Sequence, residues 1–191
     1  MTKNILLVGV GGQGTILASK ILSIGLANNG YDVKMSEIHG MSQRGGSVTS
    51  HIRYSEDKVY SPVVELGQAD LIVAFEKMEA LRYLDYLKPN GKIVVNDCEI
   101  PGTPITSGTC EYPQNILEEL KTHADVTVFD ANKEAEKLGN SKVANIILLG
   151  SLIGQMNLTS INWDALLEEN VKPQFVEVNK KAIQVGIELA K

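Results

Sequence analysis

Cysteine is scarce in this chain of 191 residues: Cys98 and Cys110 are the only two, and they lie twelve positions apart. Neither belongs to a Cys-x-x-Cys pair, which argues against an iron–sulfur cluster or a structural zinc site built by this chain alone. Nothing indicates secretion, so we expect both thiols to be reduced. The sequence therefore predicts no metal site on this chain.

Clusters of like charge and long apolar segments are absent as well. The net charge is −5, with acidic and basic residues interspersed, unlike the basic patches that bind nucleic acids or membrane surfaces. The longest apolar stretch, residues 143–153, is too short to cross a bilayer. The N-terminal apolar run is too short for a signal peptide. These absences predict a cytoplasmic protein with no nucleic-acid or membrane partner.

The length fits a single domain, residues 1–191. Short apolar runs, typical of buried strands, alternate with segments of helical periodicity. The predicted strands cover residues 4–8, 31–36, 47–54, 59–64, 69–75, 92–96, 108–112 and 126–129. The predicted helices cover residues 15–29, 76–87, 114–122, 131–138, 141–156 and 174–190. This alternation predicts an α/β fold, a three-layer α/β/α sandwich with a mostly parallel, mixed sheet, whose residues 141–191 form a helical C-terminal section.

Two local patterns make the predicted topology more specific. The first two strands and the helix between them form a Rossmann-like β-α-β unit of about thirty residues. Residues 55–58 read as a turn, so residues 59–64 are expected to return antiparallel to 47–54. Pro89-Asn90-Gly91 is expected to end the helix that precedes the strand 92–96.

A first glycine-rich loop, Gly9-Val10-Gly11-Gly12-Gln13-Gly14, follows the first predicted strand and matches the pattern G-x-G-x-x-G. Such glycines permit a tight turn and let backbone amides approach an anion at a helix N-terminus. Glu37 lies where dinucleotide-binding proteins hold a ribose. The same glycines would also suit close packing of strand and helix. A stand-alone NAD-binding dehydrogenase or sensor is therefore one alternative.

A second loop, Glu37-Ile38-His39-Gly40-Met41-Ser42-Gln43-Arg44-Gly45-Gly46, follows the second strand, and an ordinary dinucleotide site has no need of it. Arg44 is suited to a bidentate contact with phosphate or carboxylate, with glycine amides beside it; alternatively it pins its own loop or pairs with Glu37. His39 is a candidate proton donor. We expect one rim, at the carboxyl ends of adjacent strands, to be formed by Gly11, Gly12, Gln13, Gly14, Gln43, Arg44 and Gly45. Gly9, Glu37 and Gly46 complete the set of candidate cofactor-binding residues.

The two loops together resemble the gamma-type domain of the 2-oxoacid:ferredoxin oxidoreductases. The Gln43-Arg44-Gly45-Gly46 element is the most specific part of the resemblance, which covers nearly the whole chain. Within the family the chain is most similar to the indolepyruvate branch, where this domain is a separate small chain. Pyruvate, 2-oxoglutarate and branched-chain oxoacids are the alternative substrates, because specificity would lie largely in the partner.

The resemblance implies an enzyme that decarboxylates a 2-oxoacid on thiamine diphosphate, passes two electrons through iron–sulfur clusters to ferredoxin and releases an acyl-CoA. The chain has two cysteines and no Gly-Asp-Gly signature of a magnesium–diphosphate site. Thiamine diphosphate, Mg and 4Fe-4S clusters are thus expected in a larger catalytic subunit, and the isolated chain is expected to be inactive. Its own loops would contact coenzyme A or form only the subunit interface.

Three further expectations concern single features. A self-associating structural module, with residues 143–156 as its interface, is a third functional alternative. Asn145 interrupts that apolar helix and is expected to bond a buried backbone group rather than point into the cleft. Cys98 follows a predicted strand and either approaches the site or is a small apolar loop residue; we expect the second.

Overall fold

A computed structural model describes residues 1–40 and 45–191. The strands are β1 (Lys3–Val10), β2 (Asp32–His39), β3 (Ser47–Ser55), β4 (Ala69–Ala74), β5 (Leu87–Asn96) and β6 (Asp125–Phe129). The α-helices are α1 (Thr15–Asn28), α2 (Lys77–Arg82), α3 (Thr103–Thr106), α4 (Ile116–His123), α5 (Ala131–Lys137), α6 (Ala144–Gln155), α7 (Trp163–Asn170) and α8 (Val176–Leu189). Three 3-10 turns are η1 (Leu84–Tyr86), η2 (Ser141–Val143) and η3 (Pro173–Phe175).

The strands form one six-stranded sheet in the order β2-β3-β1-β4-β5-β6. The neighbouring pairs β1–β4, β4–β5 and β5–β6 are parallel, whereas β3 runs antiparallel to both β1 and β2. The prediction of a mostly parallel, mixed sheet is confirmed. Strands β1 and β2 run in the same direction and are joined through α1, but β3 lies between them.

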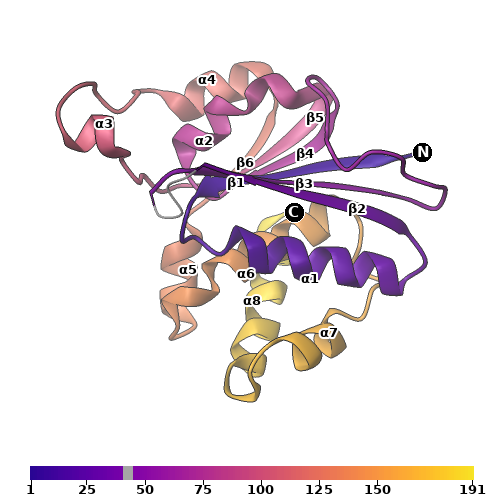
Figure 1. The fold of residues 1–191 in the computed structure, drawn as a ribbon. Helices are drawn as coiled ribbons and strands as arrows, with labels where there is room; N and C mark the ends of the chain where they lie inside the picture. The colour runs from indigo at the N-terminus through magenta and orange to yellow at the C-terminus, as the bar shows by residue number, and fades with distance from the viewer. Residues whose placement is uncertain (41–44) are drawn as a thin grey trace.

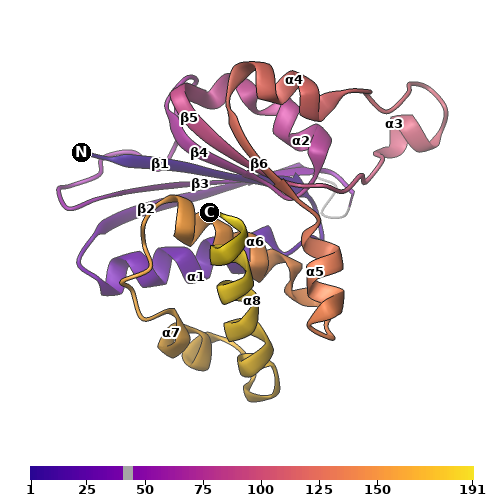
Figure 2. The same cartoon turned by 180° about the vertical axis from the view of Figure 1, so that it is seen from behind.

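Helices cover both faces of the sheet, which gives the three predicted layers. Helices α1, α5, α6, α7 and α8 lie on one face, and α2, α3 and α4 lie on the other (Figures 1 and 2). Alternate residues of β1 pack on opposite faces of the sheet, because successive side chains of a strand point to opposite sides. Ile5 and Leu7 belong to the core under α1, whereas Leu6 and Val8 belong to the core under α2.

The predicted hairpin is wrong, because residues 59–64 form no strand. Their apolar pattern arises from packing on the α2 face of the sheet, where Val64 is buried. Side chains of β3 hold the segment: the backbone N–H of Val64 donates to His51 Nδ1 at 3.1 Å, and Arg53 donates to the Ser61 and Val63 carbonyls. The antiparallel partners of β3 are instead β1 and β2.

Three further regions differ from the predictions. Pro89-Asn90-Gly91 lies inside β5, which begins at Leu87, and Asn90 there adopts φ 64°. Residues 108–112 form no strand; the nearest regular element is the short helix α3. Helix α7 was not predicted, although Asn162 caps it by accepting a hydrogen bond from the backbone N–H of Ala165 at 3.2 Å.

Helix α6 is buried from Asn145 to Ile153 by its own chain. Its main partner is α8, and the two backbones approach closely where Gly186 faces Ile147 and Gly150 faces Ile183. This packing leaves the apolar face of α6 unavailable as a self-association surface, which removes the third alternative. Among the described residues, no helix is long and apolar enough to span a bilayer.

Candidate functional site

The two glycine-rich loops meet at the carboxyl end of β1. The backbone N–H of Gly11 donates to the Gly46 carbonyl at 2.8 Å, and the N–H of Gly45 donates to the Gly11 carbonyl at 3.3 Å. These bonds hold Gly11 of the first loop against Gly45 and Gly46 of the second loop. Gln43 and Arg44, which were predicted to belong to the same rim, lie outside the described residues.

The rim includes the open N-terminus of α1. Gly14 is the N-cap, with φ 82° and no side-chain capping bond, and no acidic residue lies in the first turn. No described residue accepts a hydrogen bond from the backbone N–H of Gly12, Thr15 or Ile16. Unpaired amides and the helix dipole make such an end attractive to an anion.

The glycines of the first loop differ in how much space their neighbours would leave for a side chain. A Cβ on Gly9 would lie 2.9 Å from both Gln13 Oε1 and Phe75 Cβ, and one on Gly14 would lie 2.6 Å from Asn145 Nδ2. Gly12 has φ 105° but open space around it. Close packing therefore explains Gly9 and Gly14, whereas Gly12 faces the solvent side of the rim.

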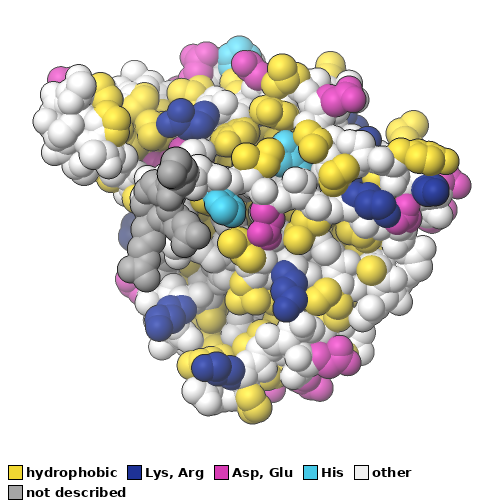
Figure 3. Space-filling view, in the orientation of Figure 1, with side chains coloured by type: hydrophobic (Ala, Val, Ile, Leu, Met, Phe, Trp, Pro, Cys, Tyr) yellow, Lys and Arg dark blue, Asp and Glu magenta, His cyan; other side chains and the backbone are white. Residues whose placement is uncertain are grey.

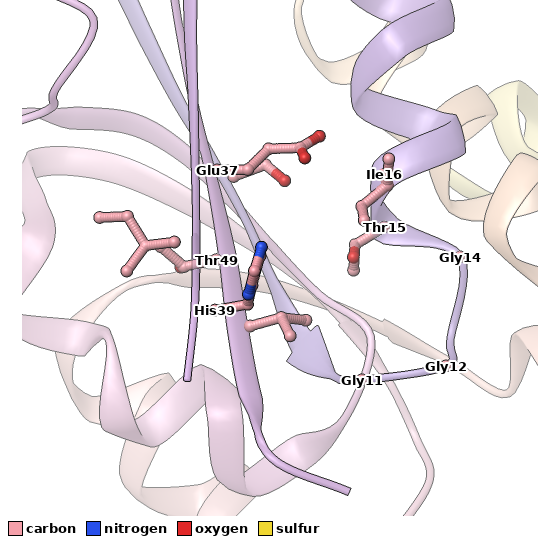
Figure 4. A pocket seen from close by; sticks show the side chains of 11 residues that line it. Gly11, Gly12, Gly14, Thr15, Ile16, Glu37, His39 and Thr49 are labelled. Atoms are coloured by element: carbon pink, nitrogen blue, oxygen red, sulfur yellow. The ribbon is translucent and has the colours of Figure 1, made fainter. Parts of the chain in front are cut away.

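A hollow of about 410 Å³, which we call the β2 hollow, lies between the α1 N-terminus and the ends of β2 and β3. Figure 4 shows Glu37 and His39 on the side of the sheet that faces Thr15 and the glycine loop, while Thr49 points to the opposite side. Glu37 Oε1 accepts a hydrogen bond from Ser19 Oγ at 3.3 Å. The hollow is lined by Gly11, Gly12, Gly14, Thr15, Ile16, Glu37, Ile38, His39, Val48, Thr49 and Ser50.

The position of Glu37 does not match the dinucleotide fingerprint. In that fingerprint the acidic residue ends the strand adjacent to the glycine-rich one. Here β3 separates β2 from β1, so the Glu37 backbone lies two strand spacings from β1, about 10 Å instead of about 5 Å. The geometry therefore weighs against the NAD-binding alternative.

A second cavity of about 530 Å³, which we call the crevice, lies on the other side of the glycine loop. It opens where β1, β4 and β5 end and where α5 and the η2–α6 segment begin. Ligands of open α/β sheets bind in such a position. The crevice is lined by Gly12, Gln13, Gly14, Phe75, Asn96, Cys98, Glu99, Ile100, Asn132, Ser141, Lys142, Ala144, Asn145 and Leu148.

The crevice floor is built around one backbone carbonyl. The carbonyl oxygen of Phe75 accepts hydrogen bonds from Gln13 Nε2 at 2.7 Å, Asn96 Nδ2 at 3.1 Å and Cys98 Sγ at 3.1 Å. Gln13 Oε1 also accepts from the backbone N–H of Val10 at 2.8 Å. The side chain of Gln13, predicted to bind a ligand, thus bonds within the chain through both polar atoms and fixes the loop against β4.

Cys98 lies in the crevice but is not activated. Burial, followed by the nearby Glu76 carboxylate, raises the pKa of its thiol to about 11. At neutral pH the thiol stays protonated, which suits a donor to the Phe75 carbonyl and not a nucleophile. Cys98 is thus half-buried and hydrogen-bonded, more polar in role than the small apolar residue expected from the sequence.

Asn145 joins the glycine loop to the start of α6. Its Nδ2 donates to the Gly14 carbonyl at 3.2 Å, which confirms the predicted bond to a backbone group. Its Oδ1 is buried without a hydrogen-bond partner among the described residues. The side chain therefore also lines the crevice, so both interpretations of this residue hold in part.

Sequence reasoning missed the residues on the far wall of the crevice. Ser141 and Lys142 lie in the 3-10 turn that leads into α6, and Asn132 lies in the first turn of α5. Lys142 is exposed and is the one cation among the described lining residues. No spacing in the sequence marks these residues, because only the fold brings them opposite the glycine loop. Among the described residues, no group of three or more His, Cys, Asp or Glu could hold a metal ion.

Comparison with known proteins places the chain among oxidoreductases. Residues 4–189 match the family described as "Pyruvate ferredoxin/flavodoxin oxidoreductase". The chain is 38% identical over 196 aligned residues to indolepyruvate oxidoreductase subunit IorB of Pyrococcus horikoshii, covering 98% of this chain and 96% of the relative. It is 29% identical to 2-oxoglutarate synthase subunit KorC of Methanothermobacter marburgensis, covering 99% and 97%.

A solved structure has a similar fold along the whole chain. The gamma subunit of keto/oxoacid ferredoxin oxidoreductase from Geobacter sulfurreducens PCA aligns with a TM-score of 0.71 and 26% identity, covering 98% of each chain. The mixed six-stranded sheet and its helices therefore recur in a protein of this kind.

Proposed function

The chain belongs to the pyruvate ferredoxin/flavodoxin oxidoreductase family, and on this premise we propose that it is the small subunit of an indolepyruvate-type 2-oxoacid:ferredoxin oxidoreductase. The higher identity to the indolepyruvate relative, 38% against 29% for the 2-oxoglutarate relative, supports the arylpyruvate substrate class. The complex would lie in the cytoplasm, where both free cysteines would stay reduced.

The partner would be a larger subunit that carries thiamine diphosphate, Mg and 4Fe-4S clusters. In the proposed reaction, one 2-oxoacid anion and one CoA thiol yield an acyl-CoA, CO2 and one proton, while two ferredoxins each take up one electron. Bound thiamine diphosphate supplies the carbanion chemistry, and the clusters supply the electron path. This chain would complete the cleft beside that centre and hold part of CoA.

The open N-terminus of α1 is the observation that carries this role. Coenzyme A contains a diphosphate and a ribose phosphate, and the rim offers amides of Gly12, Thr15 and Ile16 that no described residue uses. Lys142 lies across the crevice from Gly12, whereas Thr15 and Ile16 line the adjoining β2 hollow on the other side of the glycine loop. A helix N-terminus opposite a lysine is suited to bind phosphate.

The side chains around these amides would position the CoA phosphates but not react with them. Gln13 and Asn96 hold the loop and the start of α5 through the Phe75 carbonyl and the Ala131 N–H. The thiol of Cys98 stays protonated and would not compete with the CoA thiol for the acyl group. The chain would therefore contribute binding and orientation, and the isolated chain would be inactive.

Anaerobic co-production with the larger subunit tests the assignment. We expect the two chains to co-purify with iron–sulfur absorbance and to oxidise indolepyruvate with CoA and ferredoxin, faster than pyruvate or 2-oxoglutarate. A colourless chain that purifies alone with bound NAD would contradict the proposal.

A lysine-to-glutamate change tests the CoA role. Lys142→Glu would raise the KM for CoA about tenfold, as expected for one lost phosphate contact replaced by repulsion, and would leave the KM for indolepyruvate unchanged. Lys20→Glu, on the exposed surface of α1, is the matched control and should behave as the wild type. Equal CoA requirements in both variants would place CoA elsewhere.

Arg44 separates the two roles proposed for the loops. If the loops contact CoA, Arg44→Ala raises the CoA requirement while the complex still assembles. If the loops form only the subunit interface, the same variant loses assembly.

A further inference from the structure

Residues 100–112 form an arm that projects from the body of the molecule on the α2 side. Its tip is the short helix α3, which stands apart from the other helices in both ribbon views (Figures 1 and 2). From Pro101 to Cys110 every residue except Gly102 and Ile105 is exposed. Packing on the core of its own chain therefore does not explain why this segment holds its shape.

The tip is folded on itself through local hydrogen bonds. The Gly102 carbonyl accepts from the backbone N–H of Ile105 and of Thr106, each at 3.0 Å, and the Pro104 carbonyl accepts from that of Thr109 at 2.9 Å. The hydroxyls of Ser107 and Thr109 lie 2.9 Å apart. The arm therefore has a defined conformation of its own.

The tip of the arm carries no charge; Glu111, at its base, is the one charged residue in the segment 100–112. None of the residues from Ile100 to Cys110 is Asp, Glu, Lys, Arg or His. In the space-filling view the projection is mostly white and yellow, whereas charged side chains dot the body (Figure 3). Depletion of charged residues marks the centre of protein–protein interfaces, while solvated loops are usually polar and charged.

One buried carboxylate holds both ends of the arm. Glu76, fully buried at the end of β4, accepts from the backbone N–H of Ile100 at 3.2 Å through Oε1, and the same oxygen accepts from the Tyr112 hydroxyl. Its Oε2 accepts from the backbone N–H of Glu79 at 3.0 Å and so caps α2. The Tyr112 oxygen in turn accepts from the N–H of Met78 at 3.2 Å. The arm is therefore fixed in direction relative to the sheet.

A cavity of about 330 Å³ lies between the arm and α2. Its walls include Val10, Met78, Ile100, Pro104 and Ile105, with the buried Glu79 carboxylate bonded to Ser47 Oγ at 2.5 Å and to Arg82 Nε at 3.1 Å. Gly45 and Gly46 of the second glycine loop also line it. The arm, the cavity and the rim thus form one continuous surface.

We propose that this arm is the element through which the chain docks on the larger subunit of its complex. The inference rests on the proposed function, which supplies the partner. The uncharged tip would lie against an uncharged surface of the larger subunit, and the cavity would receive an apolar side chain from it. Docking here brings the partner onto the surface that continues into the α1 N-terminus, where the proposed CoA site lies. Pre-positioning by Glu76 lowers the ordering cost of association.

A charge on the tip tests the proposal with the whole complex. Thr103 is exposed and its side chain makes no hydrogen bond among the described residues, so Thr103→Lys adds a charge without removing a bond. We expect this variant to weaken binding to the purified larger subunit about thirtyfold or more, as at an interface hot spot. Thr159→Lys, in the exposed α6–α7 connection on the other side of the sheet, is the matched control and should bind as the wild type.

The outcomes separate the two proposals. Wild-type binding by Thr103→Lys overturns docking through the arm and leaves the proposed function intact. If the wild-type chain itself fails to bind the larger subunit, the proposed function fails and the inference fails with it.

If Thr103→Lys lowers the melting temperature of the isolated chain, Tyr112→Phe takes its place, with Tyr60→Phe as control. Tyr112→Phe is then expected to speed hydrogen exchange in residues 100–112 and weaken binding about tenfold; unchanged binding by an arm that has loosened would overturn the proposal.

Discussion

The α6–α8 pair and the arm lie on opposite sides of the same sheet and are held by different means. Between α6 and α8 the backbones touch: a Cβ on Gly186 would lie 1.9 Å from the Ile147 carbonyl oxygen, and one on Gly150 would lie 2.3 Å from that of Ile183. The arm has no such packing and depends on a few polar bonds to Glu76.

This difference relates the energetics of each region to its use. A close-packed helix pair forms one cooperative unit with the core, so any added atom disturbs the whole fold. An arm held by a few hydrogen bonds can loosen locally while the core stays folded. The close packing of α6 and α8 suits a rigid scaffold, and the few bonds of the arm suit a surface that loses its bound water when a partner docks.

Adding one methyl group to the helix pair should have the largest effect. Gly186→Ala forces α6 and α8 apart and is expected to destabilise the chain by about 3 kcal/mol, the upper end of overpacking. Urea unfolding of the isolated chain measures this loss. The matched control is Gly102→Ala in the arm, where the nearest atom to a new Cβ is 3.8 Å away. If both variants lose the same stability, the two regions do not differ as described.

Removal of the carboxylate that anchors the arm should have a smaller effect. Glu76→Ala leaves the N–H groups of Glu79 and Ile100 and the Tyr112 hydroxyl without their acceptor. Loss of the helix cap and of buried hydrogen bonds is expected to cost about 2 kcal/mol, because water can replace part of them at the arm. Glu76→Gln keeps one oxygen and should lose about half as much.

Hydrogen exchange measured in Glu76→Ala makes the comparison between the arm and the helix pair more specific. Protection should fall in residues 100–112 and stay unchanged in α6 and α8. Uniform loss of protection along the chain would show that Glu76 supports the fold as a whole and not the arm in particular.

The regular elements could be predicted because their signals are local. The buried strands and the helices α1, α5, α6 and α8 follow from their apolar patterns, and a glycine or asparagine soon after α1, α5 and α6 marks where these three helices end. The insertion of β3 between β1 and β2 could not be predicted, since strand order depends on pairing between distant segments. The pattern of residues 59–64 was misleading for the same reason: Val59 and Val64 are buried, but Val64 packs against the sheet and not within it.

The candidate site was predictable in part. Glycine spacing marked the two loops, and the structure brings them into contact through the bond between Gly11 and Gly46. The chemistry of Gln13 was not predictable, because an amide after a glycine turn can bind a ligand or its own backbone equally well. Lys142 and Asn132 carry no local signal at all, because they reach the crevice only through the packing of α5 and α6.

His51 extends the comparison to the sheet itself, with the smallest expected effect. It lies on the α2 face, buried beside Tyr86, where Nδ1 accepts from the Val64 N–H and Nε2 has no partner among the described residues. Burial lowers its pKa below the ordinary value of 6.5.

Below about pH 6.5 the unfolded chain therefore takes up a proton on His51 that the folded chain resists, so the free energy of unfolding falls as the pH falls. Between pH 7 and pH 5.5 the wild type should lose about 1 kcal/mol more than His51→Gln, measured by urea unfolding at both pH values. Equal losses would mean that protonation of His51 is accommodated, and that the segment over β3 is held as loosely as the arm.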